Sequence, residues 1–309
     1  MPEVPVKGRF APSPTGRMHA GNVYAALMAW LVAKSQGGTI VLRIEDLDRE
    51  RSKECFIDAV MRDFEMLGLT WDEGPYFQHD RDDAYEEAFQ VLSDEGLVYP
   101  CFCSRADLHA ASAPHRGEKL VYPGTCRNLS EEQRLEREKE KAPAMRLMVD
   151  KRVVGLEDQI QGHYEIDLAD DCGDFLVKRS DGAFAYQLAV VVDDAAQGIT
   201  SVVRGVDLLT STPQQIYLQQ LLGYEQPTYG HIPLLVAERD RRLSKRDHDA
   251  SLDALLERFE TPRGIIGHIA WVTGILEEDC EATPEELLEM FDLQAFKERM
   301  NDPIQVRWR

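Results

Sequence analysis

The stretch that decides the fold is GRFAPSPTGRMHAGN, residues 8–22, and the helical pattern VYAALMAWLVAKSQ follows it directly. VKGRFA, residues 6–11, indicates a short buried strand, and apolar residues at helical spacing predict a plain amphipathic helix over 22–36. A strand that enters a helix through a loop rich in glycine and proline presents unpaired N–H groups, which favour an anion. The loop matches neither the Gly-Lys-Ser/Thr phosphate loop nor the G-x-G-x-x-G dinucleotide loop.

Two interpretations stay open on the loop alone. It is either a phosphate site to which His19 and Asn22 contribute, or a tight strand-to-helix turn capped by a histidine. In the first case Gly16 and Gly21 would let the backbone come close to a ligand.

The surrounding patterns predict an α/β fold with a parallel sheet. TIVLRIED, residues 39–46, indicates a buried parallel strand, and residues 50–67 a helix that Gly68 closes. We expect further helices at 82–96, 212–224 and over most of 251–300, and an insertion at 101–145 with the charged helix SEEQRLEREKEKA. Further strands are expected at AMRLMV, HYEIDL, DFLVKRS, AFAYQLAVVVDD and HIPLLVA, with a hairpin turn at Asp181–Gly182.

Composition narrows the class of protein. Apolar residues make up 43% of the chain and charged residues 29%, which fits a soluble globular protein. No apolar run is long enough for a membrane helix, and the N-terminus lacks a signal-like segment, so we expect a cytoplasmic protein without a membrane partner. The net charge of −20 taken alone argues against nucleic-acid binding, although ERDRRLSKR is locally basic.

A second motif, RLSKR at residues 242–246, follows the expected strand HIPLLVA. A lysine in such a loop could reach ATP phosphates, or the run could be an ordinary solvated loop. Together, HAGN and RLSKR resemble the paired signatures of the class I aminoacyl-tRNA synthetases. RFAPSPTGRMHAGN, RIEDLDRER, FAYQLAVVVDDAAQGITSVVRGVDLL and YGHIPLL resemble the glutamyl branch, which implies a Rossmann-type catalytic domain.

The resemblance implies the residues of the site. Glutamate would contact eight residues: Arg9, Phe10, Ala11, Pro12, Ser13, Glu45, Tyr186 and Arg204. ATP, with Mg²⁺, would contact six: His19, Gly21, Asn22, Leu243, Ser244 and Lys245, of which His19 and Lys245 act on the phosphates. Which arginine meets the side-chain carboxylate stays open. So do an ordinary strand-end charge for Glu45 and core packing for Tyr186.

The chain ends at Arg309, which leaves little room after Asp247 for the anticodon-binding module of a full glutamyl synthetase. This arrangement resembles the truncated glutamyl-queuosine branch, which activates L-glutamate without tRNA and esterifies it to queuosine in the anticodon arm of tRNA(Asp). A compact enzyme charging the 3′ end of tRNA(Glu) and a non-catalytic tRNA-binding paralogue are the alternatives. We expect a monomer divided into a first catalytic half at 1–100, an inserted subdomain at 101–172, a second catalytic half at 173–236 and a lysine-motif loop with short helical region at 237–309.

Three of the six cysteines cluster in the expected insertion. Cys101, Cys103 and Cys126, with Tyr122, resemble the metal site of this branch and imply one structural Zn²⁺. His109 or His115 could replace the tyrosine, and three incidental thiols in a reducing compartment are the alternative.

Overall fold

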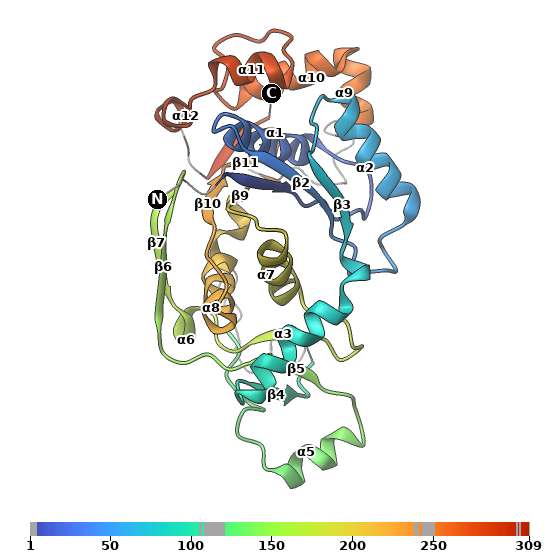
Figure 1. The fold of residues 1–309 in the computed structure, drawn as a ribbon, viewed down its shortest axis with the longest axis vertical. Coiled ribbons are helices and arrows are strands. Elements are labelled where there is room, and N and C mark those ends of the chain that lie inside the picture. Colours follow the sequence, from blue (N-terminus) through green and yellow to red (C-terminus); the bar gives the residue numbers. More distant parts are fainter. Residues whose placement is uncertain are drawn as a thin grey trace.

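The computed structural model describes residues 5–104, 107, 121–237, 241–242, 251–300, 302 and 304–308. Its first part is the expected parallel α/β unit (Figure 1). Strands β1 (Lys7–Phe10), β2 (Thr39–Ile44) and β3 (Glu73–Phe77) pair in parallel, and helices α1 (Ala20–Lys34) and α2 (Glu54–Met66) connect them. The short helix η1 (Gln78–Asp80) and α3 (Asp82–Asp94) follow.

A second parallel pair completes the central layer. β9 (Ser201–Gly205) pairs with β10 (Thr228–Ile232), and η2 (Val206–Ser211) and α8 (Thr212–Leu222) connect them. β9 lies beside β1, where the Thr200 N–H donates to the Lys7 carbonyl at 2.9 Å. The spatial order is therefore β3-β2-β1-β9-β10. In such sheets, ligands bind outside the carboxyl ends of the strands where the order reverses, here between β1 and β9.

The stretch AFAYQLAVVVDD is not the strand that we expected. Residues Tyr186–Ala196 form helix α7, which packs against α3 and α8. The three consecutive valines Val190–Val192 favour a strand by their branching, yet all are buried because helices cover more than one side of α7. A short apolar run cannot distinguish a buried strand from a buried helix.

Helix α1 exists as expected but is not amphipathic. Val23, Leu27 and Leu31 are buried, and so are Tyr24 and Met28 on other faces of the helix. Strands β1 and β9 contact one side of α1, and helices α10 (Pro262–Val272) and α11 (Pro284–Met290) contact it as well. The helix is buried nearly all round because the C-terminal region covers it (Figure 1).

The chain between the two parallel units forms an antiparallel extension. Strands β4 (Val98–Cys101), β5 (Ala144–Leu147) and β8 (Phe175–Lys178) make one sheet, and the expected charged helix is α5 (Glu131–Glu138). Because β8 pairs with β5, this sheet crosses the boundary expected at 172/173. A hairpin not predicted as such, β6 (Val153–Asp158) with β7 (Gly162–Asp167), leads into α6 (Leu168–Asp171) and packs against β10.

Two further expectations are met in part. Gly182 has a φ of 90° in a turn, but the predicted hairpin is only the single bridge between Lys178 and Phe184 before α7 begins. HIPLLVA forms two strands, β10 and β11 (Leu234–Ala237), which Pro233 separates.

The C-terminal region is helical, as expected, but it also contributes strands. β11 pairs antiparallel with β12 (Arg241–Arg242) and parallel with β13 (Gln305–Arg307). Helices α9 (Leu252–Phe259), α10, α11 and α12 (Leu293–Arg299) lie at the end of the molecule opposite α5 (Figure 1). The C-terminal strand ties this region to the chain that leaves the central layer.

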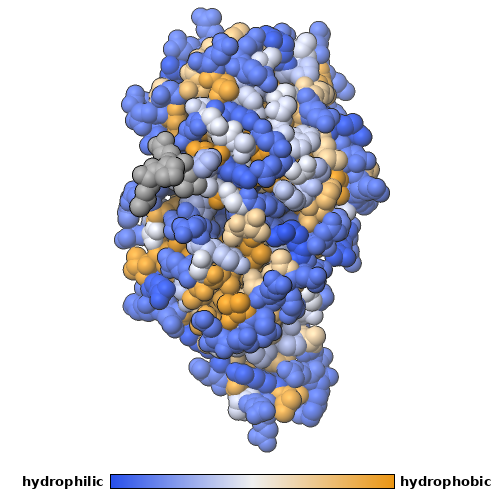
Figure 2. All heavy atoms as spheres, viewed as in Figure 1, coloured by the Kyte–Doolittle hydropathy of each residue, from blue (hydrophilic) through white to orange (hydrophobic). Residues whose placement is uncertain are grey.

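The surface is mainly hydrophilic on the face that Figure 2 shows, with hydrophobic residues in small patches. Within the described part of the chain, no helix has the length and apolar character needed to span a bilayer.

Candidate active site

A cavity of about 520 Å³ opens at the carboxyl ends of β1, β2 and β9. Nine of the residues expected to bind glutamate or ATP line it: Arg9, Phe10, Ala11, Pro12, Ser13, Asn22, Glu45, Tyr186 and Arg204. They come from segments nearly two hundred residues apart, which the reversal in strand order brings together. His19 and Gly21 are not among the described residues that line the cavity.

Arg9 lies at the end of β1 and is 5% exposed. Its Nη1 donates to the Val203 carbonyl on β9 at 3.2 Å, and its Nε lies 3.7 Å from Asp194 Oδ1. This Nε has no hydrogen-bond partner among the residues that the structure describes. Burial lowers the pKa of Arg9, and the neighbouring Arg43 lowers it further, while Asp194 raises it.

Arg204 lies on β9 and is also 5% exposed. Its Nη2 donates to Thr212 Oγ1 and Gln215 Oε1, both at 2.8 Å, and its Nε donates to His231 Nε2 at 3.1 Å. The remaining nitrogen, Nη1, has no partner within the described ranges. Arg9 Nε and Arg204 Nη1 are thus both buried without a hydrogen-bond partner among the described residues, as is Arg43 Nε, and a buried N–H without a partner is costly.

Glu45 follows β2 and has a side chain that is 9% exposed. Its Oε1 accepts from Arg43 Nη2 at 3.3 Å, and its backbone N–H donates to the Pro12 carbonyl at 2.9 Å. Burial raises the pKa of Glu45, against the influence of Arg43 and Arg9, which lower it. Tyr186, the first residue of α7, has its pKa raised by burial and then by Glu45.

Sequence analysis did not identify the buried ion pair beside this cavity, which Arg43 forms with Asp194. Arg43 is fully buried on β2, and its Nη1 donates to Asp194 Oδ1 at 2.7 Å and to Gln197 Oε1 at 2.9 Å. An arginine inside the strand pattern TIVLRIED was a usable signal, because a charge in a buried strand needs a partner. That partner lies on α7, the helix that we expected as a strand.

His19 is the N-cap of α1. Its Nδ1 accepts from the Gly21 N–H at 3.1 Å, and Asn22 Oδ1 accepts from the His19 N–H at 3.1 Å. A Cβ at position 21 would lie 3.1 Å from the histidine ring, so the glycine leaves room for this cap. The capped turn is therefore present, and a phosphate contact by His19 stays a prediction.

Leu243, Ser244 and Lys245 of the second motif lie outside the described residues. The chain that follows them returns to the first motif, because the Leu252 N–H donates to the Met18 carbonyl at 3.0 Å. Arg17, which lines the cavity, pairs with Asp253 at 2.6 Å. The start of α9 thus lies against the loop that enters α1.

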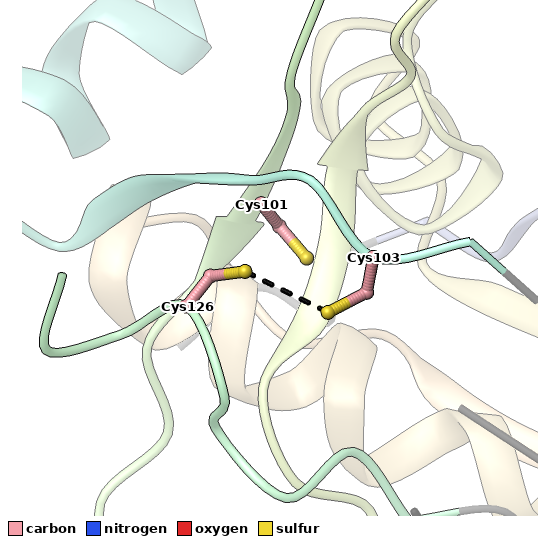
Figure 3. A group of neighbouring side chains, drawn as sticks. All are labelled: Cys101, Cys103 and Cys126. Atoms are coloured by element: carbon pink, nitrogen blue, oxygen red, sulfur yellow. Dashed lines mark hydrogen bonds between the residues drawn. The ribbon is translucent and has the colours of Figure 1, made fainter. Parts of the chain in front are cut away.

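The cysteine cluster lies between β4 and the start of the α5 segment. Figure 3 shows Cys101, Cys103 and Cys126 pointing toward one another, and their sulfur atoms lie within 4.8 Å of one another. The Tyr122 hydroxyl is 3.4 Å from Cys101 Sγ and 3.8 Å from Cys103 Sγ. Tetrahedral Zn²⁺ with bonds of about 2.3 Å to sulfur places its ligands about 3.8 Å apart. His109 and His115 fall on residues that the structure does not describe.

The surroundings of these thiols shift their pKa values in opposite directions. Arg146 Nε donates to Cys101 Sγ at 3.2 Å, and its guanidinium lies 3.8 Å from the centre of the Tyr122 ring. Burial would raise the pKa of Cys101, but the contacts with Tyr122 and Arg146 lower it. Burial and the contact with Cys126 raise the pKa of Cys103 to about 11. Three cysteine thiols in one cluster are a donor set that fits zinc, which deprotonates coordinating thiols.

Comparisons with known proteins agree with this geometry. The family model for class I tRNA synthetases (E and Q), catalytic domain, matches residues 5–301. A protein from Symbiobacterium thermophilum named Glutamyl-Q tRNA(Asp) synthetase is 44% identical over 298 residues, which cover 93% of this chain and 92% of that protein. A Glutamate–tRNA ligase from Coprothermobacter proteolyticus is 39% identical over 93% of this chain but only 62% of its own length.

A solved structure gives the same architecture. The crystal structure of a glutamate tRNA ligase from Elizabethkingia meningosepticum in complex with its amino acid superposes with a TM-score of 0.81 at 26% identity. The alignment covers 98% of this chain and 67% of that one. The chain belongs to the class I tRNA synthetase family (E and Q) and is a tRNA synthetase-like ligase.

Proposed function

We propose that this protein activates L-glutamate with ATP and transfers it to the queuosine base in the anticodon of tRNA(Asp). The observation that carries the first half of this proposal is the charge pattern of the cavity. Arg9 and Arg204 each keep one buried N–H group without a partner in the described part of the chain, and Glu45 supplies a carboxylate. Glutamate, with two carboxylates and one ammonium, is complementary to this arrangement.

Eight residues would hold glutamate in the cavity. The two arginines meet its carboxylates and Glu45 its ammonium, while Tyr186 and the segment Phe10–Ser13 form the walls. ATP would bind at the N-terminus of α1, where His19, Gly21 and Asn22 lie, with Leu243, Ser244 and Lys245 on the pyrophosphate side. Mg²⁺ accompanies ATP and reduces the charge of its phosphates.

The reaction has two steps. An oxygen of the glutamate α-carboxylate attacks the α-phosphorus of ATP, and the bond to pyrophosphate breaks, which leaves glutamyl-adenylate. A hydroxyl of the queuosine diol then attacks the adenylate carbonyl, so that an ester forms and AMP leaves. His19 and Lys245 stabilise charge on the phosphates, since such steps depend on positioning and electrostatics.

The choice of acceptor rests on the relatives. A relative with the Glutamyl-Q name is matched over 92% of its length, whereas the Glutamate–tRNA ligase is matched over only 62%. We also propose one structural Zn²⁺ on Cys101, Cys103, Tyr122 and Cys126, and a monomer acting in the cytoplasm.

Two assays test the proposal. Glutamate-dependent pyrophosphate exchange should proceed without tRNA, and its absence under all conditions would favour a non-catalytic tRNA-binding protein. Labelled glutamate should transfer to queuosine-containing tRNA(Asp) and to its isolated anticodon stem-loop, but not after periodate oxidation of the diol. Labelling of the 3′ end of tRNA(Glu), with none of the stem-loop, would assign the enzyme to tRNA(Glu) instead.

A further inference from the structure

A chain of buried polar groups leads from the β6–β7 hairpin to Arg204. Asp158 ends β6, His231 lies on β10, and the side chains of both are fully buried. Asp158 Oδ2 lies 2.5 Å from His231 Nδ1, and His231 Nε2 lies 3.1 Å from Arg204 Nε. The hairpin packs directly against β10 (Figure 1). These contacts join a hairpin outside the parallel sheet to the wall of the cavity.

The hydrogen-bond chemistry fixes the proton on His231. A guanidinium only donates, so His231 Nε2 accepts from Arg204 Nε and carries no proton; the Thr212 hydroxyl, whose Oγ1 lies 3.1 Å from the same nitrogen, can then only donate to it. The single proton of the neutral ring is therefore on Nδ1, where it is donated to Asp158. Burial lowers the pKa of His231, which agrees with a neutral ring.

Asp158 accepts hydrogen bonds from three backbone N–H groups as well as from the imidazole of His231. Its Oδ1 accepts the backbone N–H groups of Ile160 at 3.0 Å, Gln161 at 2.9 Å and His231 at 3.0 Å. The other oxygen is left for the histidine ring. Burial raises the pKa of Asp158, but the hydrogen bond with the His231 ring, followed by those from the backbone N–H groups of Gln161 and His231, brings it below its ordinary value, so this oxygen can only accept.

These hydrogen bonds determine the orientation of the Arg204 side chain. Its Nε is fixed by His231, and its Nη2 by Thr212 and Gln215, so the planar guanidinium has its orientation set along one edge. Only Nη1 is left without a partner among the described residues, and Arg204 lines the cavity. A group held in this way loses little freedom when a carboxylate binds.

We propose that Asp158 and His231 are positioning residues: Asp158 selects the Nδ1–H form of His231, and His231 thereby holds the Arg204 guanidinium in place beside the cavity in which the substrate carboxylate would bind. This inference rests on the proposed role of Arg204 in binding glutamate. Neither residue touches the substrate, and both act through the guanidinium.

The substitution Asp158→Asn tests the selection of the tautomer with almost no change of shape. The amide oxygen keeps the three backbone N–H bonds, so the NH₂ group replaces the oxygen that faces His231. Nδ1 must then accept, the ring proton moves to Nε2, and Nε2–H opposes the Arg204 N–H. We expect the KM for glutamate to rise about ten- to a hundredfold, with the KM for ATP unchanged.

Matched variants separate positioning from folding. Gln161 lies on the same hairpin as Asp158, and its Nε2 donates to the backbone carbonyl of His231 on β10 at 2.7 Å; Gln161→Ala removes this bond and should leave the KM for glutamate unchanged. His231→Gln, whose amide oxygen can take the place of Nε2 as acceptor, should restore part of the affinity that His231→Leu loses. In an Arg204→Lys background, Asp158→Asn should add little further effect, since the two act in series.

A spectroscopic readout does not depend on activity. In ¹⁵N-histidine-labelled protein, His231, assigned by its loss in His231→Gln, should show the proton on Nδ1 in the wild type and on Nε2 in Asp158→Asn. A wild-type protein without glutamate-dependent exchange would refute the proposed function and leave the tautomer result to stand. An active wild type whose Asp158→Asn variant keeps its KM for glutamate, or the Nδ1–H form, would overturn the positioning role.

Discussion

The roles of the two buried arginines of the cavity can be distinguished by measuring which of them the protein needs in order to prefer glutamate over glutamine. Glutamate and glutamine share the α-carboxylate and differ only in the side-chain group. The arginine that meets the side chain should therefore control the preference for glutamate, and the other should not. We expect one of the variants Arg9→Ala and Arg204→Ala to lose this preference and the other to keep it.

The size of the effect follows from the site. Arg9 and Arg204 are both 5% exposed, and each has a buried nitrogen without a partner among the described residues, so a carboxylate that binds here meets a desolvated charge. Truncating one member of such a pair costs about 2–5 kcal/mol, or about thirtyfold to several thousandfold in kcat/KM. The variant that reads the side chain should lose this factor for glutamate and much less for glutamine.

The variants should still fold. Without Arg9, Asp194 keeps its 2.7 Å bond from Arg43 Nη1, and without Arg204 the neighbouring cavity gives water access to the groups left behind. Pyrophosphate exchange with each amino acid gives the kcat/KM ratios, thermal unfolding checks folding, and Arg263→Ala, which removes an exposed pair with Glu286, is the control. An unchanged ratio in both variants would refute the assignment of a side-chain carboxylate to either arginine.

Three other outcomes are expected. Purified protein should carry about one Zn²⁺ per chain by elemental analysis. Cys101→Ser should lose the zinc together with thermal stability, and Tyr122→Phe should bind zinc more weakly; wild-type protein without zinc would contradict the site. Burial raises the pKa of Glu45, so the KM for glutamate should begin to rise on acidification at a pH above the ordinary glutamate pKa of about 4.3. This rise at low pH should be absent in Glu45→Gln, and its persistence there would assign it to another group. Asp253→Ala, which keeps the pair of Arg17 with the buried Asp63, should cost at most about 1 kcal/mol of unfolding free energy in denaturant titrations, since the pair of Asp253 with Arg17 is exposed. A larger loss would show that the contact between α9 and the first motif stabilises the fold.

Local patterns in the sequence predicted the parts of the fold that local chemistry determines. Gly68 and Gly96 both have positive φ directly after helices, so the ends of α2 and α3 fell where the sequence placed them. Local patterns could not predict that α1 is buried nearly all round, or that residues 186–196 form the helix α7 rather than a strand. Both helices are covered on several sides by segments distant in sequence, which removes the apolar and polar faces on which periodicity depends.

The same limit applies to the site. Resemblance supplied the residues that line the cavity, and the geometry brings nine of them together. The groups that orient them, Arg43, Asp194, Asp158 and His231, carry no motif that local spacing could reveal. The Arg43–Asp194 pair joins residues 151 positions apart, and the Asp158–His231 pair joins residues 73 apart. Such pairs are determined by the order of the strands rather than by the local sequence.

The balance of buried charges around the cavity leaves some nitrogens without partners. Arg9, Arg43 and Arg204 lie near one another and are buried. Arg43 and Arg204 lower the pKa of Arg9, while Asp194 pairs with both Arg9 and Arg43. Asp194 and Glu45 offset part of that charge but leave Arg9 Nε and Arg204 Nη1 without partners inside the described protein. A fold selected for stability alone would pair these nitrogens, because each buried N–H without a partner costs free energy. Unpartnered nitrogens alone do not identify a site, because Arg43 Nε is unpartnered as well. Under the proposed function, an anionic substrate would complete the hydrogen bonds of Arg9 and Arg204, the two arginines that line the cavity.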